Sequence, residues 1–142
     1  MPGIDISLIP IPLVDVILPM CEGYIKDVIK RAENDISMEV IRNQLKRGET
    51  LLVTISEGSE IIAVNILETR EFETGHKVLL IPITAGKRMS EWLDDFLKLA
   101  HQLAKDSGCK ELRGISCRKG WTRALRDYGW YDIHTVIGCE VK

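Results

Sequence analysis

The sequence predicts a single α/β domain built on a mixed sheet, and three observations lead to this prediction. The chain has 142 residues, close to the roughly 150 residues of an average domain. Its hydrophobic fraction of 45% and charged fraction of 28% are typical of a globular protein. Strand-like and helix-like segments follow one another along residues 1–142 in the order β-α-α-β-β-β-α-β-α-β.

One part of this order predicts parallel strands. Between Lys77 and Cys117 the pattern is strand, helix, strand, which places the two strands parallel with a right-handed crossover. The remaining connections are short and hairpin-like. We therefore expect a mostly antiparallel sheet with one parallel β-α-β unit and helices on both faces.

The N-terminal third has one strand and two helices. Residues Ile4–Leu8 alternate apolar and polar side chains, the pattern of a half-buried strand. Apolar residues recur at helical spacing from Val14 to about Glu33, with Pro19 positioned to kink the helix or delay its start. Ser37 is a suitable N-cap for a second helix, which Gly48 would end.

Three strands are expected next. Residues Thr50–Glu57 and Ile61–Glu73 are separated by the short segment 58–60, which predicts a hairpin. The following strand, Lys77–Thr84, is apolar enough to be buried on both faces. Pro82 lies inside it and cannot donate to a ladder, so we expect a bulge or a sheet edge there.

The last part of the chain continues the alternation. Ser90 is the expected N-cap of an amphipathic helix that Gly108 ends. A short strand follows at Leu112–Cys117, and a two-turn helix then runs from about Trp121 to Gly129. Alternating residues between Ile133 and Val141 predict a final antiparallel strand.

Charge, cysteine spacing and hydropathy exclude several classes of protein. Nineteen basic and 21 acidic residues give a net charge of −2, so nucleic acid is an unlikely partner. The four cysteines form no C-x-x-C pair, and none of His76, His101 and His134 has a ligand at metal spacing, so no metal site is expected. The first basic residue is Lys26 and prolines interrupt the apolar N-terminus, which predicts neither a signal peptide nor a membrane span.

Two basic turns are candidate anion sites. Residues 84–89 and 117–120 each follow a strand of the parallel unit, each contain a glycine and two cations, and each lead into a helix. Helix N-termini at the carboxyl edge of a parallel sheet bind phosphate groups. The alternative is a pair of solvated turns that happen to carry lysine and arginine.

Few other residues carry a chemical signal. Glu68 lies within a predicted strand and could act as a general base, although an exposed hairpin face would explain it equally well. A basic cluster near the C-terminus alternates with aromatic residues, which leaves single-stranded nucleic-acid binding as a weaker alternative. The cluster comprises Arg113, Arg118, Lys119, Arg123 and Arg126.

The element order and several short segments resemble the GCN5-related N-acetyltransferase (GNAT) superfamily. The segments are residues 51–53 and 61–70, Gly86-Lys87-Arg88-Met89 with Trp92, and the stretch from Gly120 to Trp130 with the sequence GWTRALRDYGW. The sequence is most similar to the short, divergent GNAT-like proteins of tailed phages and prophages. The resemblance implies a GNAT-like fold over nearly the whole chain.

The resemblance also implies a cofactor, acetyl-CoA, and residues to bind it. The pyrophosphate loop of the family corresponds to residues 85–90, which assigns Ala85, Gly86, Lys87, Arg88 and Met89 to the cofactor, with Arg118 and Lys119 steering its nucleotide phosphate.

Two further residues are implied for catalysis. Family members often carry a general-acid tyrosine four residues before the glycine that ends the last helix. Leu125 stands at that position here, and Tyr128 is the nearest candidate. Glu68 or an ordered water would take the proton of the amine.

Three functions remain open at this point. The first is an acetyl-CoA-dependent N-acyltransferase with a small amine or a protein as acceptor. The second is a non-catalytic phage virion or assembly component, which would contact phage structural proteins or itself through apolar segments such as residues 1–20. The third is a regulator that binds CoA or a nucleotide without turnover. We expect the protein in the host cytoplasm or the phage virion.

Overall fold

The fold is a five-stranded sheet with helices on both faces. A computed structural model describes residues 3–32, 35–115 and 119–142. The strands occur in the sheet in chain order: β1 (Ile4–Leu8), β2 (Leu51–Glu57), β3 (Glu60–Glu71), β4 (Lys77–Gly86) and β5 (Glu111–Gly114). Neighbouring strands from β1 to β4 are antiparallel, whereas β4 and β5 are parallel. The predicted mixed sheet with one parallel unit is confirmed.

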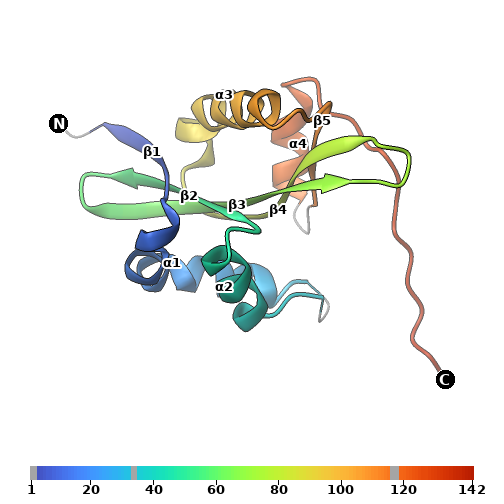
Figure 1. Cartoon of the computed structure of the whole chain (residues 1–142), viewed down its shortest axis with the longest axis horizontal. Coiled ribbons are helices and arrows are strands. Elements are labelled where there is room, and N and C mark those ends of the chain that lie inside the picture. Colours follow the sequence, from blue (N-terminus) through green and yellow to red (C-terminus); the bar gives the residue numbers. More distant parts are fainter. Residues whose placement is uncertain (1–2, 33–34, 116–118) are drawn as a thin grey trace.

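The helices divide between the two faces of the sheet (Figure 1). A short 3₁₀ turn leads into α1 (Val14–Ile29), and α1 and α2 (Met38–Lys46) cover one face. On the other face lie α3 (Met89–Asp106) and α4 (Lys119–Arg126). Pro19 lies inside α1 without ending it.

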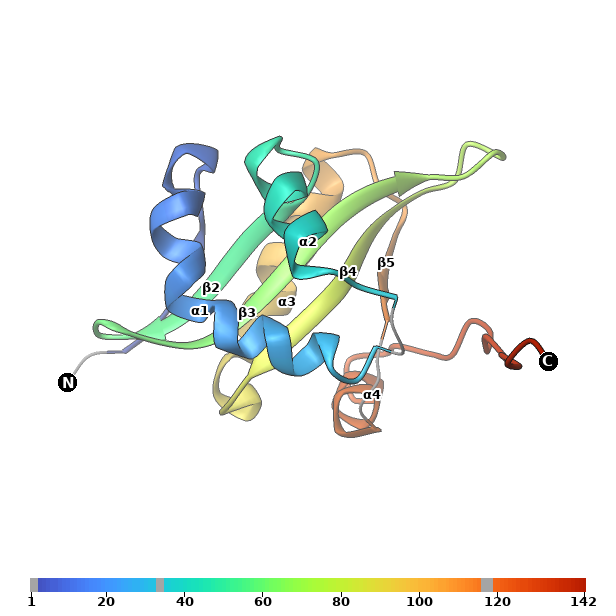
Figure 2. The same ribbon diagram turned by 90° about the horizontal axis from the view of Figure 1, so that it is seen from below.

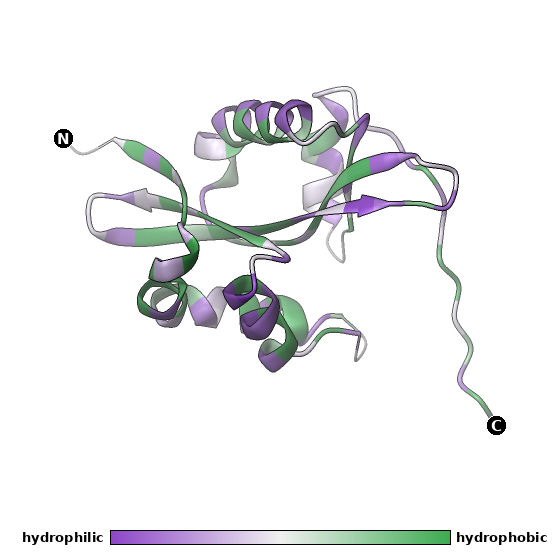
Figure 3. Ribbon diagram, viewed as in Figure 1, coloured by the Kyte–Doolittle hydropathy of each residue, from purple (hydrophilic) through white to green (hydrophobic). Residues whose placement is uncertain are grey.

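Each face of the sheet has its own core, and the apolar side of α3 is turned toward the strands (Figure 3). The α3 side contains Trp92, Phe96 and Ala100 packed on residues such as Val53 and Ile81. The side of α1 and α2 contains, among others, Ile25, Ile41, Leu45, Leu52, Ile66 and Ile83. Both cores follow from the helical stripes and strand alternation of the sequence.

Pro82 produces the predicted bulge. Ile66 pairs with Ile83 and Glu68 pairs with Leu80, so Ile81 and Pro82 together lie opposite the single residue Leu67. The extra residue changes which side chains face which core. Leu79 and Ile81 belong to the α3 core, whereas Ile83 and Ala85 belong to the core of α1 and α2. A bulge bends its strand and increases the local twist.

Two local expectations are wrong. Ser90 does not cap α3, because the helix begins one residue earlier, at Met89, and Arg88 occupies the N-cap position in a left-handed conformation with φ 61°. The final strand does not form. Residues 130–142 have no regular secondary structure, and Val136, Ile137 and Val141 are 87%, 89% and 96% exposed. Alternation supplies a strand's side chains, but a strand also needs a hydrogen-bonding neighbour, and this tail leaves the body of the domain (Figure 1).

Candidate functional site

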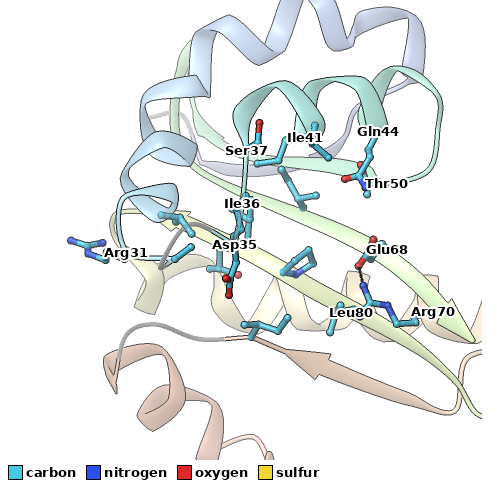
Figure 4. A pocket seen from close by; sticks show the side chains of 18 of the residues that line it. Arg31, Asp35, Ile36, Ser37, Ile41, Gln44, Thr50, Glu68, Arg70 and Leu80 are labelled. Carbon is cyan, nitrogen blue, oxygen red and sulfur yellow. Dashed lines mark hydrogen bonds and ion pairs between the residues drawn. The ribbon is translucent and has the colours of Figure 1, made fainter. Parts of the chain in front are cut away.

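The candidate site is a cavity of about 540 Å³ on the side of the sheet that carries α1 and α2. Its floor is formed by β3 and β4, and its walls come from the end of α1, the segment before α2, and α2 itself (Figure 4). Most lining side chains are apolar, including Val28, Ile41, Ile66 and Leu80. Pockets of this size and character bind small organic molecules.

The cavity lies where β4 and β5 separate. The paired residues of the two strands end at Ile81 and Gly114, the position of the Pro82 bulge. Beyond it, residues 82–86 of β4 have no strand partner on the β5 side within the described ranges. Figure 2 shows the two strands diverging toward their carboxyl ends, where α3 and α4 begin. The pairing of the two strands therefore stops beside the cavity, which Ile115 and Trp121 also line.

Glu68 is the one predicted catalytic residue that lies in the cavity. It follows Leu67 on β3 and pairs across the sheet with Leu80, which places its side chain on the cavity floor. The side chain is 19% exposed, and its Oε1 accepts a hydrogen bond of 2.7 Å from Arg70. The carboxylate is therefore held in a defined position with access to the cavity.

Tyr128, the other predicted catalytic residue, lies elsewhere. It follows the end of α4, its backbone N–H donates to the carbonyl of Leu125, and its side chain is 45% exposed. It is not among the residues that line the cavity. The structure thus does not bring Tyr128 and Glu68 together in the cavity.

Gly86 is fixed by the packing of β4 against β3. Its φ is +127°, and an added Cβ would lie 2.4 Å from both the Cα of Ala63 and the carbonyl oxygen of Ile62. The next residue, Lys87, donates its backbone N–H to that same oxygen at 2.9 Å. Ala85 is buried in the core of α1 and α2. The backbone N–H of Lys87 is thus already bonded to β3.

The cations of the same turn are bound to carboxylates. Arg88 donates two hydrogen bonds, of 3.1 and 2.8 Å, to Glu57 and two, of 2.6 and 2.9 Å, to Glu91. Lys87 pairs with Glu60 at 3.2 Å. The hydrogen bonds from Arg88 lower the pKa of both Glu57 and Glu91. Arg88 therefore joins the end of β2 to the first turn of α3.

The remaining predicted cofactor residues are only partly accounted for. Met89 is the first residue of α3 and packs against the α3 core. Lys119 is the first residue of α4 and is exposed, whereas Arg118 lies outside the described residues. Of the second basic turn, Gly120 falls in the first turn of α4.

Several polar residues that no sequence pattern indicated also line the cavity. Asp35, Gln44 and Thr50 all line it. Thr50 is 4% exposed, and its hydroxyl oxygen has no hydrogen-bond partner among the residues that the structure describes. Leu51 pairs with Leu67, so the antiparallel register places Thr50 next to Glu68. The predicted hairpin implies this pairing of Thr50 with Glu68, but no pattern in the sequence indicates that a cavity lies over these residues.

Other chemical centres are not found in the described part of the chain. No group of three or more His, Cys, Asp or Glu side chains there is placed to hold a metal ion. Burial raises the pKa of the Cys21 thiol to about 11, which makes it an unreactive core residue at neutral pH. No helix within the same ranges is long and apolar enough to cross a membrane.

Comparison with known proteins identifies the fold. No protein-family model matches the sequence, and no curated protein matches it significantly. Solved structures do match over the full chain. A predicted acetyltransferase from Clostridium acetobutylicum, solved with acetyl-CoA, has a TM-score of 0.70 at 14% identity, covering 96% of each chain.

Two further solved structures are similar to this chain over nearly its full length. An aminoglycoside acetyltransferase from an uncultured soil metagenomic sample, in complex with trehalose, has a TM-score of 0.68 at 12% identity, covering 98% of this chain and 97% of that one. The ribosomal-protein-alanine N-acetyltransferase of Brucella melitensis has a TM-score of 0.69 at 10% identity, covering 96% and 99%. The chain therefore has the GNAT-like fold that its sequence predicted.

Proposed function

We propose that the protein is an acetyl-CoA-dependent N-acetyltransferase that acts on a small amine. The observation that carries the proposal is the end of pairing between β4 and β5 beside a cavity that is lined by Glu68. A protein of the same fold has been solved with acetyl-CoA, and another is an aminoglycoside acetyltransferase.

Two features of the chain fit the cofactor. Residues 82–86 of β4 present an edge without a strand partner on the β5 side in the described part, and this edge can hydrogen-bond the amides of an extended pantetheine arm as a neighbouring strand would. The 18-residue helix α3 begins three residues after β4 ends, and the positive end of its dipole can receive a pyrophosphate. The exposed Lys119 at the start of α4 adds a cation at the same edge of the sheet.

The chain's own contribution to the chemistry is to position the amine and remove its proton. Acetyl-CoA supplies an acetyl thioester, which only an uncharged amine can attack. Glu68 is placed on the cavity floor, where its carboxylate can bind an ammonium group and accept its proton as general base. The apolar walls exclude water from the acceptor and orient its apolar part.

The cofactor position can be tested by adding a negative charge at the start of α3. Ser90→Asp places a carboxylate in the first turn, where the helix dipole favours it, so the protein should remain folded. The same charge should repel pyrophosphate and weaken acetyl-CoA binding at least tenfold in isothermal titration calorimetry. Gln102→Glu, on an exposed part of the same helix, is the matched control and should bind as the wild type does. Equal weakening in both variants, or in neither, would contradict the position.

The role of Glu68 is tested separately. Glu68→Gln should lower the rate of acetyl transfer by about 10²–10⁴-fold, the usual contribution of a general base, while acetyl-CoA affinity stays unchanged. Glu71→Gln, further along β3 and exposed, is the control. Release of CoA thiol with a panel of primary amines gives the rate. A Glu68→Gln enzyme as fast as the wild type would remove Glu68 from the mechanism.

A second candidate function is that of a non-catalytic assembly component of the tailed-phage or prophage type. The exposed apolar side chains of residues 133–141 favour it, because such segments are typical contact surfaces between subunits. Removing residues 131–142 should then abolish association with phage structural proteins or with itself, measured by co-sedimentation with assembled particles and by light scattering. An unchanged association would exclude this role for the tail.

A further inference from the structure

The hydroxyl of Thr50 is the unexplained polar group of the cavity. Thr50 is 4% exposed, and its Oγ1 has no hydrogen-bond partner in the described structure, although its side chain lines the cavity. A buried polar atom without a partner destabilises a protein, and since most buried polar atoms in native structures are hydrogen-bonded, each exception needs an explanation.

Thr50 lies beside Glu68 on the cavity floor. Leu51 and Leu67 are paired between β2 and β3. Thr50, the residue just before β2, therefore lies opposite Glu68, the residue after Leu67 on β3. Directly opposite residues have Cβ atoms roughly 4.5–5.5 Å apart. Figure 4 shows both side chains at the same end of the cavity, with Gln44 nearby and with Arg31 and Asp35 at the other end.

The two groups offer complementary chemistry. In the described contacts, Oε1 of Glu68 accepts from Arg70, which leaves Oε2 for an ammonium group. A rotation of about 120° about χ1 of Thr50 brings the hydroxyl to the position of the methyl group and the methyl group to that of the β-hydrogen, and in this rotamer the hydroxyl can face the cavity. The hydroxyl can then donate to or accept from an oxygen close to the bound amine.

We infer that Thr50 and Glu68 form a two-point acceptor subsite that selects amino alcohols, with the hydroxyl group on the carbon next to the one bearing the amine. This inference rests on the proposed acetyl transfer for its biological meaning, but it concerns acceptor binding, which can be measured without the cofactor. The apolar walls formed by Val28, Ile41 and Ile66 accommodate the hydrocarbon part of the acceptor.

Two matched probes test the subsite. Phenethylamine and 2-amino-1-phenylethanol differ only in the hydroxyl group beside the amine-bearing carbon. Calorimetric titration of the wild type should show the amino alcohol binding about three- to tenfold more tightly, as expected for one neutral hydrogen bond. Tyramine, whose hydroxyl is on the ring, should show no such gain.

Three variants assign the preference to its residues. Thr50→Val keeps the shape and removes an unpaired buried hydroxyl, so it should fold and lose the preference, while Thr50→Ser should retain it. Glu68→Gln should weaken both amines by a similar factor and leave their ratio unchanged. Equal affinities in the wild type, failure of either amine to bind, or a preference that survives in Thr50→Val would overturn the inference.

The same data separate this inference from the proposed function. A protein that prefers the amino alcohol through Thr50 but transfers no acetyl group would retain the subsite and lose the acetyltransferase assignment. A protein that acetylates both probes with equal affinity and rate would retain the assignment and lose the subsite.

Discussion

The two faces of the sheet are covered in different ways. On one face, the long helix α3 presents a single continuous stripe, and Trp92, Phe96 and Leu97 fill the space above β2, β3 and β4. On the other face, two shorter helices, α1 and α2, cover the sheet, and a cavity of about 540 Å³ remains between them and the floor of β3 and β4. One face is a closed core and the other is part core and part site.

The difference shows how one sheet serves stability and binding at once. A closed face has no room for a ligand, because its side chains are packed at the density of a crystal. The open face contains a charged group, Glu68, that lines the cavity, and burying a charge without a partner in a closed core is costly. The largest effects on stability are therefore expected on the α3 face, and the largest effects on binding on the other.

The strongest test compares a large side chain on each face. Phe96→Ala removes a fully buried ring from the α3 core and should cost about 3–5 kcal/mol of unfolding free energy. Val40→Ala removes two methyl groups from a 51% exposed residue that lines the cavity and should change stability by less than about 0.5 kcal/mol. Urea denaturation measures both. If both variants lost a similar amount of unfolding free energy, the division between a closed and an open face would be contradicted.

A second test concerns the junction between β4 and α3. Gly86→Ala places a Cβ within 2.4 Å of backbone atoms of β3 at a φ of +127°, so strain and overpacking together should cost about 2–5 kcal/mol. Gly108→Ala also has a positive φ, of +73°, but its Cβ would meet nothing within 4 Å, and it should cost about 1–2 kcal/mol. If thermal denaturation shows the same loss for both, close packing is not the role of Gly86.

The smallest expected effect is a pH dependence at the start of α3. Arg88 lowers the pKa of Glu57 and Glu91 below their ordinary value of 4.5. The stabilisation from these pairs is thus complete above that pH and is lost as the pH falls through the lowered values. Arg88→Gln should therefore be less stable than the wild type at pH 7. The difference in free energy of unfolding between the two proteins should be smaller at pH 3. A stability difference that is the same at both pH values would show that these pairs contribute nothing.

The secondary structure was largely predictable because it depends on local pattern. The stripe of α3 and the alternation of β2 and β3 fix which side chains are buried. Pro82 also indicated the bulge, since proline cannot donate to a ladder. The prediction of a final strand was wrong because it used local pattern alone. Residues 133–141 have the alternation of a strand, but whether a strand forms depends on a neighbour that no local pattern specifies.

The candidate site was less predictable because it depends on contacts between distant segments. Glu68 was expected to be chemically active, and it does line the cavity. The cations Lys87 and Arg88 were expected to face a phosphate, and the acidic partners Glu57, Glu60 and Glu91 became evident only when the ends of β2 and β3 met the start of α3. Spacing along the chain could not show that these charges neutralise one another.

The bulge in β4 has a consequence for how such a site can arise. Leu79 and Ile81 face the α3 core, whereas Ile83 and Ala85 face the core of α1 and α2. If Pro82 were removed, the side chains of β4 would alternate regularly between the two cores. Each of these four side chains would then stay in its present core. Pro82 therefore behaves as a one-residue insertion that leaves both cores intact. A one-residue insertion at this point can therefore bend β4, next to the end of its pairing with β5, while the residues of both cores stay in their layers.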